Sequence, residues 1–529
     1  MCHRLSVQRK RRLAKRAFVV PEDPKFDQQW HLSASGDGLS TYPHLNVVDA
    51  WRRGVFGNGV HVSVVDDGLQ YTHPDLMENY DQRGSYDWND QDSDVTPHPR
   101  YDDHGTPAAG LCCGARNGAA LTTYEGAFCG VGVAYLARVS GLRLIATDTE
   151  DWQEAHINWA QDIVDVYSNS WGPTDDGNRL EGPGPLAAAA VENAIANGRG
   201  GKGSIYVFAG GNGRGHGDNC NYDGWANWRY TITIAAVAFS GKQPWYSEDC
   251  SALIATVPSS GDSRSITTTD LLGAPGTASG DCTSSFSGTS AAAPMAAGVV
   301  ALILDANPQL GWRDVQGVII ESVSPIDEAD ADWQRNGAGH AANHKYGFGM
   351  MNAGRAVQLA KVWRPWPRES VRLASGVRRV NSDVNAEPLE QKFEFRAEHL
   401  PEGVGGAVAD LIVEHVELNM TIDTTYRGTL KIELKAPSGI VARLQEWHHD
   451  NHADIANWRY QSIFSWGESA AGVWTIRVTP QPQSDAKSRW NSFHLLVHTH
   501  VRDANRGRPA DFQFAANLPD GNSNNNDQR

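Results

Sequence analysis

The sequence contains 529 residues, which is longer than one ordinary domain and predicts two or three domains. Sixty-two acidic residues outnumber 46 basic ones and give a formal net charge of −16, so nucleic acids and acidic membrane surfaces are poor partners and basic substrates are favoured. The longest apolar candidate, 291–304, is interrupted by Pro294 and is too short to cross a bilayer, so we expect no membrane span in this chain.

The chain begins with a strongly basic segment, 9–16, which reads RKRRLAKR. No apolar segment follows it, so it does not have the pattern of a secretion signal. We expect any signal peptide to lie outside this sequence.

From about residue 18 to residue 362, short β-branched runs alternate with alanine-rich stretches. This pattern predicts an α/β unit with a largely parallel sheet, and 60–65, 205–208 and 230–234 are predicted strands. A helix is expected to begin at Ser290. Pro294 would then fall among the first residues of that helix, whose N–H groups have no intrahelical partner.

Two prolines within 362–367 interrupt regular structure, and we place a domain boundary there. Beyond it, alternating apolar and polar residues, as at 411–416 and 474–478, predict an all-β sandwich. From residue 506 to residue 529 the chain becomes polar and rich in asparagine, which is typical of a disordered tail or linker.

Three segments carry groups that acyl transfer by a serine requires, namely a nucleophile, a base and an anion that orients the base. Asp66 ends a predicted strand, His104 follows two aspartates, and Ser290 opens the predicted helix. Each residue alone has an ordinary structural explanation, as a turn residue, a surface histidine or a helix N-cap. Their occurrence together in the order Asp, His, Ser favours catalysis, because that is the order of the subtilisin triad.

The segments VVDDG (64–68), DHGT (103–106) and GTSAAAP (288–294) resemble the three active-site signatures of the subtilases. The resemblance narrows to the kexin and furin type of proprotein convertase over about residues 11–501, and the β-domain resembles the P domain of that family. It implies a subtilisin-like α/β catalytic domain at 17–362, a β-sandwich P (Homo B) domain at 366–505, and a propeptide remnant at 1–16. It also implies that Asp66, His104 and Ser290 form the triad, with Asn212 as the oxyanion donor.

Cleavage after a basic residue requires carboxylates in the pocket, because a buried guanidinium without a partner is very costly. The resemblance implies that Asp175 and Asp223 lie in the S1 pocket, Asp67 in S2, and Glu154 and Glu181 in the outer S4 region. Asp102, two residues before His104, is a further S2 candidate, although its spacing is shifted relative to the family. The alternative for these acids is a solvated acidic loop.

Clustered aspartates with little sulfur or imidazole suit calcium better than zinc. The resemblance implies two or three structural Ca²⁺ ions, held by Asp87, Asp92 and Asp94, by Asp175, Asp218 and Glu248, and by Asp23 and Asp75. A solvated acidic loop is the alternative for 87–94. About ten extra residues, 118–127, fall in the loop that would supply the backbone ligands of the last site next to Asn117, which puts that site in doubt.

Cysteine positions are also similar to those of the convertases. The resemblance implies one disulfide between Cys129 and Cys282 and another between Cys220 and Cys250, while Cys112 and Cys113 are extra. Such bonds form outside the cytosol, so we expect the secretory pathway. The resemblance to the convertases implies the late Golgi within it.

The sequence therefore predicts a monomeric, calcium-dependent serine endopeptidase that cleaves proproteins after paired basic residues (Lys-Arg or Arg-Arg). Lys15 and Arg16 form such a pair, and we expect the enzyme to cut itself after Arg16. The alternatives are a catalytically inactive subtilase fold used for binding and a degradative subtilisin of broad specificity.

Overall fold

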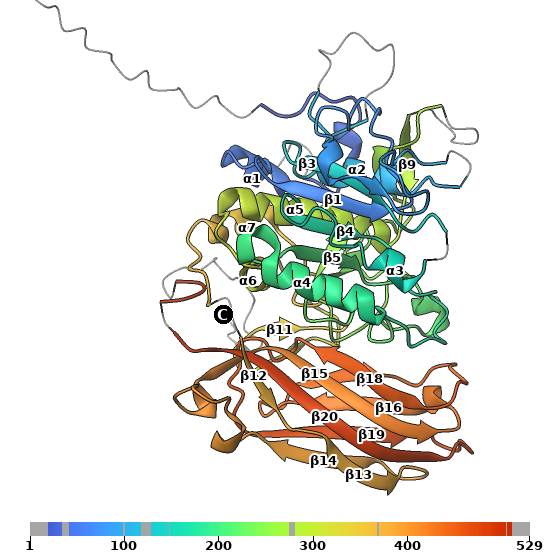
Figure 1. Cartoon of the computed structure of the whole chain (residues 1–529), viewed down its shortest axis with the longest axis vertical. Helices are drawn as coiled ribbons and strands as arrows, with labels where there is room; N and C mark the ends of the chain where they lie inside the picture. The colour runs from blue at the N-terminus through green and yellow to red at the C-terminus, as the bar shows by residue number, and fades with distance from the viewer. Residues whose placement is uncertain are drawn as a thin grey trace, which may run out of the picture.

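The computed structural model describes residues 19–33, 42–98, 101–117, 129–147, 149–273, 281–367, 370–503 and 505–509. Within these ranges the chain forms an α/β part followed by a part made of β-strands, and the two pack against each other (Figure 1). The predicted fold class, a subtilisin-like α/β domain plus an all-β sandwich, is confirmed.

A seven-stranded sheet forms the centre of the α/β part, in the order β2-β3-β1-β4-β5-β6-β7. All its neighbouring strands pair in parallel, and each strand is short and rich in apolar residues because helices cover both faces of the sheet. The strands are β1 (His61–Asp66), β2 (Tyr86–Asp87), β3 (Arg138–Arg143), β4 (Val166–Asn169), β5 (Ile205–Ala209), β6 (Thr231–Val237) and β7 (Ala255–Pro258).

Side chains of the central strands alternate between two buried layers. In β1, Val62 and Val64 belong to the apolar cluster that includes α5, whereas Val65 belongs to the cluster that includes α4. The helices are α1 (Val47–Arg52), α2 (Gly105–Cys113), α3 (Asp151–Glu154), α4 (Pro185–Gly201, where 198–200 leave the helical conformation), α5 (Thr289–Ala306), α6 (Trp312–Ser322) and α7 (Ala353–Ala360).

Helix α5 begins at Thr289, one residue before the predicted start, and Pro294 lies inside it. A proline lacks the N–H that would bond to the carbonyl oxygen four residues earlier, which here belongs to Ser290. That oxygen instead accepts a hydrogen bond from Ser170 Oγ at 3.1 Å. Pro294 thus lies beyond the first residues of the helix, and the prediction that its missing N–H would need no partner was wrong. The Ser170 hydroxyl compensates for the missing donor.

Helix α5 also bears on the membrane expectation. Among the described residues it is the one helix that is long and apolar enough to cross a membrane, and 83% of that stretch is buried inside the protein. It contacts the central sheet and is the core helix of the α/β part.

Two small ribbons complete the α/β part: β8 (Ile266–Thr269) with β9 (Cys282–Phe286), and β10 (Gln334–Arg335) with β11 (Ala341–Ala342). Single 3₁₀ turns occur at η1 (Phe26–Gln28), η2 (Gln82–Gly84), η4 (Arg214–His216), η5 (Ala397–His399), η6 (Val408–Asp410) and η7 (Arg427–Thr429).

The β-sandwich consists of two antiparallel sheets. One has the order β12-β20-β15-β18, with β13 also paired to β20, and the other has the order β14-β19-β16-β17. The predicted boundary at 362–367 falls between the last helix and the first strand of the sandwich. The strands are β12 (Val371–Ala374), β13 (Arg378–Asp383), β14 (Leu389–Glu394), β15 (Leu411–Thr424), β16 (Leu430–Lys435), β17 (Val441–Gln445), β18 (Ile455–Ser462), β19 (Val473–Pro480) and β20 (Ser488–Val501).

The two parts share buried polar contacts. Arg313 of α6 donates from Nε to Glu414 of β15 at 2.7 Å, and His500 of β20 lies 2.8 Å from the same carboxylate. Arg313 outweighs the effect of burial, so the pKa of Glu414 lies well below its usual value. Removing one member of such a buried set leaves a charge without its partner, which couples the stability of the two parts.

The structure joins Cys129 with Cys282 and Cys220 with Cys250, as the sequence analysis predicts. It also joins the neighbours Cys112 and Cys113 at the end of α2, a bond that the sequence analysis did not predict.

Candidate active site

The three residues of the predicted triad come from the ends of three elements. Asp66 is the last residue of β1, His104 immediately precedes α2, and Ser290 is the second residue of α5. His104 Nδ1 lies 2.9 Å from Asp66 Oδ1 and 3.1 Å from Oδ2, and Asp66 is 1% exposed. A buried carboxylate at this distance fixes the orientation of the imidazole ring and stabilises its protonated form.

Ser290 lies across the same cleft as His104. Its Oγ is 3.5 Å from the carbonyl oxygen of Ser170, and no hydrogen bond joins it to His104 in this structure. Catalytic hydrogen bonds are often long without substrate and shorten when substrate binds.

The orientation of Asn212 suits an oxyanion donor. Its Oδ1 accepts hydrogen bonds from the backbone N–H of Thr289 at 2.8 Å and from Thr289 Oγ1 at 3.0 Å. With the carbonyl end held in this way, the amide NH₂ is the end that can donate into the cleft, where Asn212 and Ser290 are both lining residues.

Asp67 anchors the start of α2. Its carboxylate accepts hydrogen bonds from the backbone N–H groups of His104 at 3.0 Å and Gly105 at 2.8 Å, and it is 8% exposed. Burial and the charge of Asp66 raise the pKa of Asp67 to about 7. Asp67 therefore positions the backbone of His104, and its role as an S2 acid stays a prediction.

The charge around His104 shifts its titration. Burial alone would lower the pKa of His104, but the carboxylates of Asp66, Asp67 and Asp103 outweigh it and raise the pKa to about 9. An imidazole must be neutral to act as a base, so kcat/KM is expected to increase with pH on the acid side of its profile.

The first prediction concerns that acid limb. Asp103→Asn removes one of the charges that favour the protonated ring, so the pKa of His104 falls and the acid limb moves to lower pH. For an exposed carboxylate a shift of about half a pH unit is expected. The measurement is kcat/KM against pH with a peptidyl coumarin amide. Asp485→Asn, an exposed position in the β-sandwich, is the control, and an unmoved limb in Asp103→Asn would contradict the assignment.

The two predicted S1 acids lie on neighbouring segments. Asp223 is held by the N–H of Trp225 at 2.7 Å, and a Cβ added to Gly172 would lie 2.7 Å from Asp223 Oδ2. The lack of a side chain at Gly172 thus leaves room next to this carboxylate oxygen, which any larger residue would fill. Burial, with the charges of Asp175 and Asp218, raises the pKa of Asp223 to about 7, which is the expected state of a carboxyl that lacks its cationic partner.

The two predicted S4 acids each have a polar partner within the protein. Burial raises the pKa of Glu154, and its carboxylate accepts a hydrogen bond from Thr149 Oγ1 at 3.2 Å. Glu181 is 3.3 Å from Arg179, while its backbone lies beside that of Asp223. Glu181 therefore already has a cationic neighbour that a substrate would have to displace.

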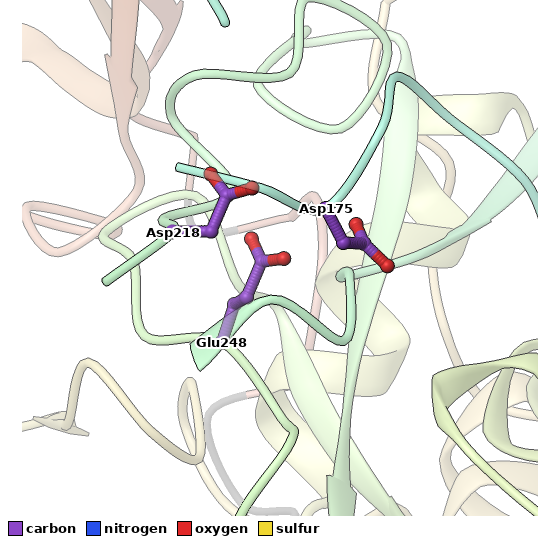
Figure 2. A group of neighbouring side chains, drawn as sticks. All are labelled: Asp175, Asp218 and Glu248. Atoms are coloured by element: carbon purple, nitrogen blue, oxygen red, sulfur yellow. The ribbon is translucent and has the colours of Figure 1, made fainter. Parts of the chain in front are cut away.

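Three carboxylates converge next to the S1 acids. Asp175, Asp218 and Glu248 each offer an oxygen, and these oxygens all lie within 4.8 Å of one another (Figure 2). No Lys or Arg among the described residues forms an ion pair with them. Burial raises the pKa of Glu248 well above its usual value and that of Asp218 to about 6. Hard oxygen ligands with uncompensated charge fit Ca²⁺.

Asp23 and Asp75 are brought together by Asn117. The backbone N–H of Asn117 donates to Asp23 Oδ1 at 3.0 Å, and its side-chain NH₂ donates to Asp75 Oδ1 at 2.7 Å. Burial raises the pKa of Asp75 to about 6, and the charge of Asp23 adds to this. Asn117 Oδ1 is buried and has no hydrogen bond from the described residues, so it is free to bind a cation. The extra residues 118–127 lie outside the described ranges.

Arg143 corrects two of the predictions. Its guanidinium lies 2.8 Å from Asp87 and 2.8 Å from Asp102, and all three side chains are buried. Asp102 is therefore not an S2 acid, because its carboxylate faces this guanidinium inside the protein. Asp87, Asp92 and Asp94 do not gather around one point either, since within the described part of the chain only the set of Figure 2 brings three such ligands together.

Several residues of the site carried no signal that the sequence analysis used. Thr289 holds Asn212, Arg143 neutralises two of the predicted acids, and Asp270 and Trp245 line the cleft beside His104 and Ser290. The position of Thr289 inside the GTS segment could have identified it. The other three lie outside the motifs.

Comparisons with known proteins agree with this geometry. Residues 57–349 match the subtilase family, and residues 413–497 match the proprotein convertase P-domain. The chain therefore belongs to the subtilase family, a family of serine endopeptidases. Its combination of a subtilase domain with a P domain is that of the kexin and furin type, so the predicted resemblance is confirmed.

Individual relatives are similar to this chain over most of its length. Furin of Mus musculus is 38% identical over 502 residues, which are 92% of this chain and 59% of that protein. Proprotein convertase subtilisin/kexin type 7 of Homo sapiens is 39% identical over 482 residues, 89% of this chain and 59% of that protein. Furin-like protease 1, isoform 1-CRR, of Drosophila melanogaster is 37% identical over 498 residues, 92% of this chain and 42% of that protein. The chain thus spans between about two fifths and three fifths of the length of these relatives.

Among solved structures, the serine protease of Aeromonas sobria has the same fold. Its TM-score is 0.75 at 22% identity, over 92% of this chain and 97% of that chain.

Proposed function

We propose that this protein is a calcium-dependent serine endopeptidase that cleaves proproteins on the carboxyl side of paired basic residues. The observation that carries the proposal is that Ser290, His104 and Asn212 line one cleft, while Asp175, which accepts the backbone N–H of Asn212, lies close to a second buried acid, Asp223. The similarity to furins supports the same substrate class. A degradative subtilisin has no need of such a pocket, and an inactive binding fold has no need of the filled catalytic positions.

In the proposed reaction, Ser290 Oγ attacks the carbonyl carbon of the scissile bond and His104 Nε2 takes its proton. Asp66 holds the Nδ1–H side of the ring during this step. The tetrahedral oxyanion accepts hydrogen bonds from Asn212 Nδ2 and from the backbone N–H of Ser290. His104 then gives the proton to the leaving amine, and water repeats the sequence to release the acid product.

Specificity is proposed to arise from successive acids along the cleft. The P1 arginine, which precedes the scissile bond, would pair with Asp223 and Asp175, and the P2 lysine or arginine would approach Asp67. Burial destabilises the charged form of these carboxylates, which is why their pKa values are raised, and pairing with a basic side chain of the substrate would stabilise that charged form. Glu154 and Glu181 would contact P4.

Calcium, when bound, would supply the positive charge that Asp175, Asp218 and Glu248 lack. Asp23 and Asp75 with Asn117 would hold a second ion. The first set is linked to catalysis, because Asp175 Oδ2 also accepts the backbone N–H of Asn212 at 3.2 Å. A change in this carboxylate would move the oxyanion donor.

The second prediction follows from that link. Removal of calcium with a chelator is expected to abolish most activity and to lower Tm, and added Ca²⁺ should restore both, because ligand that binds only the folded state stabilises it. Glu248→Gln should raise the calcium concentration needed for half-maximal activity by about tenfold, since affinity depends on the number of charged ligands.

The control for this prediction is Glu402→Gln, an exposed acid of the β-sandwich. Activity and Tm that stay unchanged after dialysis against a chelator would remove calcium from the proposal.

The third prediction is self-cleavage after Arg16. Lys15 and Arg16 lie outside the described residues, so this site remains a prediction from the sequence. N-terminal sequencing of the expressed wild type should give Ala17 as the first residue. An active product that still begins at Met1, or equal cutting of a Ser290→Ala form, would count against self-processing.

The disulfides support a proposed location in the secretory pathway, because such bonds persist in oxidising compartments. The late Golgi is proposed on the resemblance to the kexin and furin family alone. A monomer is proposed as the active form.

A further inference from the structure

A cleft of about 830 Å³ lies directly beside the proposed catalytic residues, with His104, Asn212 and Ser290 among its lining residues. Neither Asp175 nor Asp223, the proposed S1 acids, lines it. The part of a substrate before the scissile bond would occupy the side of those acids. We infer from this that the cleft lies on the side of the leaving peptide, the segment after the scissile bond.

The charged residues of this cleft are Asp103, His104 and Asp270, and its lining contains neither lysine nor arginine. Asp270 is 9% exposed, and its Oδ1 accepts the N–H of Leu271 at 2.8 Å. Burial and the nearby charge of Asp103 raise the pKa of Asp270. Within the described part of the chain, no cation forms an ion pair with either carboxylate. Apart from His104 of the triad, the cleft thus offers negative charge without a lysine or arginine beside it.

The position of Asp270 relative to His104 is fixed by the β8–β9 ribbon. Asp270 follows β8 directly, and the side-chain hydroxyls of Thr268 and Thr269 donate to the carbonyl oxygens of Pro107 (2.9 Å) and Thr106 (2.8 Å) of α2. The disulfide from Cys282 at the start of β9 attaches the ribbon to a third segment. A carboxylate on such a support is preorganised and loses little entropy when a ligand binds.

Trp245 lines the same cleft and is 74% exposed, a high value for a side chain of this size. An exposed indole provides a face on which the methylene stem or the charged end of a basic side chain can lie. Phe286 adds a second aromatic lining residue. The cleft therefore combines carboxylates with aromatic surface, which together suit a long cationic side chain.

We propose that this cleft receives the first two residues after the scissile bond, P1′ and P2′, and that Asp103 and Asp270 select a lysine or arginine there. The inference rests on the proposed function and extends it to the leaving-group side. It assigns Asp103, Asp270 and Trp245 a role in specificity. Because basic residues would then be favoured on both sides of the scissile bond, a run of basic residues could be cut inside the run as well as after its last residue.

The test uses peptides that are identical up to the P1 arginine and carry Lys, Gln or Glu at P1′, and a second set that varies P2′. At one or both positions, kcat/KM is expected to fall in the order Lys, Gln, Glu, with about three- to tenfold between the extremes, the range for partly exposed charge pairs. Equal values throughout, or Glu as the preferred residue, would overturn the inference. Failure to cleave any of these peptides would instead contradict the proposed function.

Variants assign the preference to particular carboxylates. Asp270→Asn retains the acceptor for the Leu271 N–H and is expected to reduce the Lys-to-Glu ratio towards one, as is Asp103→Asn. Each kcat/KM is divided by the value for the same sequence ending in a coumarin amide, which has no residue after the scissile bond. This division removes any change that a variant causes in the triad.

Asp485→Asn serves as the matched control and should retain the wild-type ratio. Trp245→Ala provides a second measurement, because loss of the indole face should weaken cleavage of the Lys peptide more than that of the Gln and Glu peptides. A Lys-to-Glu ratio that persists in the double variant of Asp103 and Asp270 would overturn the assignment.

Discussion

Ser290→Ala is expected to lower kcat by about six orders of magnitude, the loss found when the nucleophile of a subtilisin triad is removed. The hydroxyl group is the atom that attacks the substrate, and no other group in the cleft takes its place. Its contribution to folding is small, because the Oγ makes one contact of 3.5 Å, to the carbonyl oxygen of Ser170. The variant should therefore retain the Tm and the calcium response of the wild type.

Asn212→Ala gives the matched comparison for this prediction. Loss of one oxyanion donor costs about 10²- to 10³-fold in kcat, so this variant should be measurably active where Ser290→Ala is not. Both values come from turnover of a dibasic peptidyl amide, with the protein concentration determined by absorbance. Near-normal turnover in purified Ser290→Ala would end the assignment of the nucleophile.

Asp223→Asn is expected to lower kcat/KM for peptides with arginine at P1 by about 10²- to 10³-fold. A guanidinium in this pocket would lose one of its compensating charges, and an incompletely paired buried charge costs about 3–5 kcal/mol. The loss should be much smaller for a peptide with an uncharged P1 residue, because that residue makes no ion pair in the pocket.

The control variant is Asp176→Asn, which changes a neighbouring acid whose carboxylate lies 3.2 Å from Arg179 instead of in the pocket. It should keep the wild-type preference for arginine. If Asp223→Asn reduced cleavage after arginine and after an uncharged residue by the same factor, its effect would be on folding and not on recognition.

The fold and the centre of the site could be predicted because their signals are local. Strand β1 begins one residue after the predicted start and ends at Asp66, and β5 begins at the predicted residue. Asp66 follows a buried β-branched run, and Ser290 precedes an alanine-rich helix, so both positions can be recognised within a few neighbouring residues.

The acids that were assigned wrongly depend on a contact that is distant in the sequence. From the sequence, Asp102 and Asp87 are carboxylates in acidic segments, which predicts roles in substrate and calcium binding, respectively. Arg143 lies 41 residues after Asp102, at the end of a buried strand, and the parallel pairing of the sheet brings it between them. No pattern around Asp102 indicates this partner, because ion pairing inside a fold is set by topology.

The acidic leaving-group cleft could not be predicted for a related reason. Asp270 and Trp245 belong to loops without a recognisable motif. Asp270 meets His104 when the β8–β9 ribbon packs on α2, and Trp245 reaches the same cleft from the segment between β6 and β7. A single acid in a loop is normally a solvated residue. Its role becomes visible only in the fold, where the described lining of the cleft holds no lysine or arginine and the catalytic residues lie beside it.

The central claim is that this subtilase recognises a basic P1 residue of its substrate through carboxylates and that this activity requires calcium. The most direct measurement is the cleavage of two peptides that differ only in arginine or alanine at P1, each with calcium and with a chelator. We predict cutting after the arginine in the presence of calcium, and little or none in the other three conditions. Equal cleavage of the two peptides, or cleavage after arginine that persists in the chelator, would contradict the account.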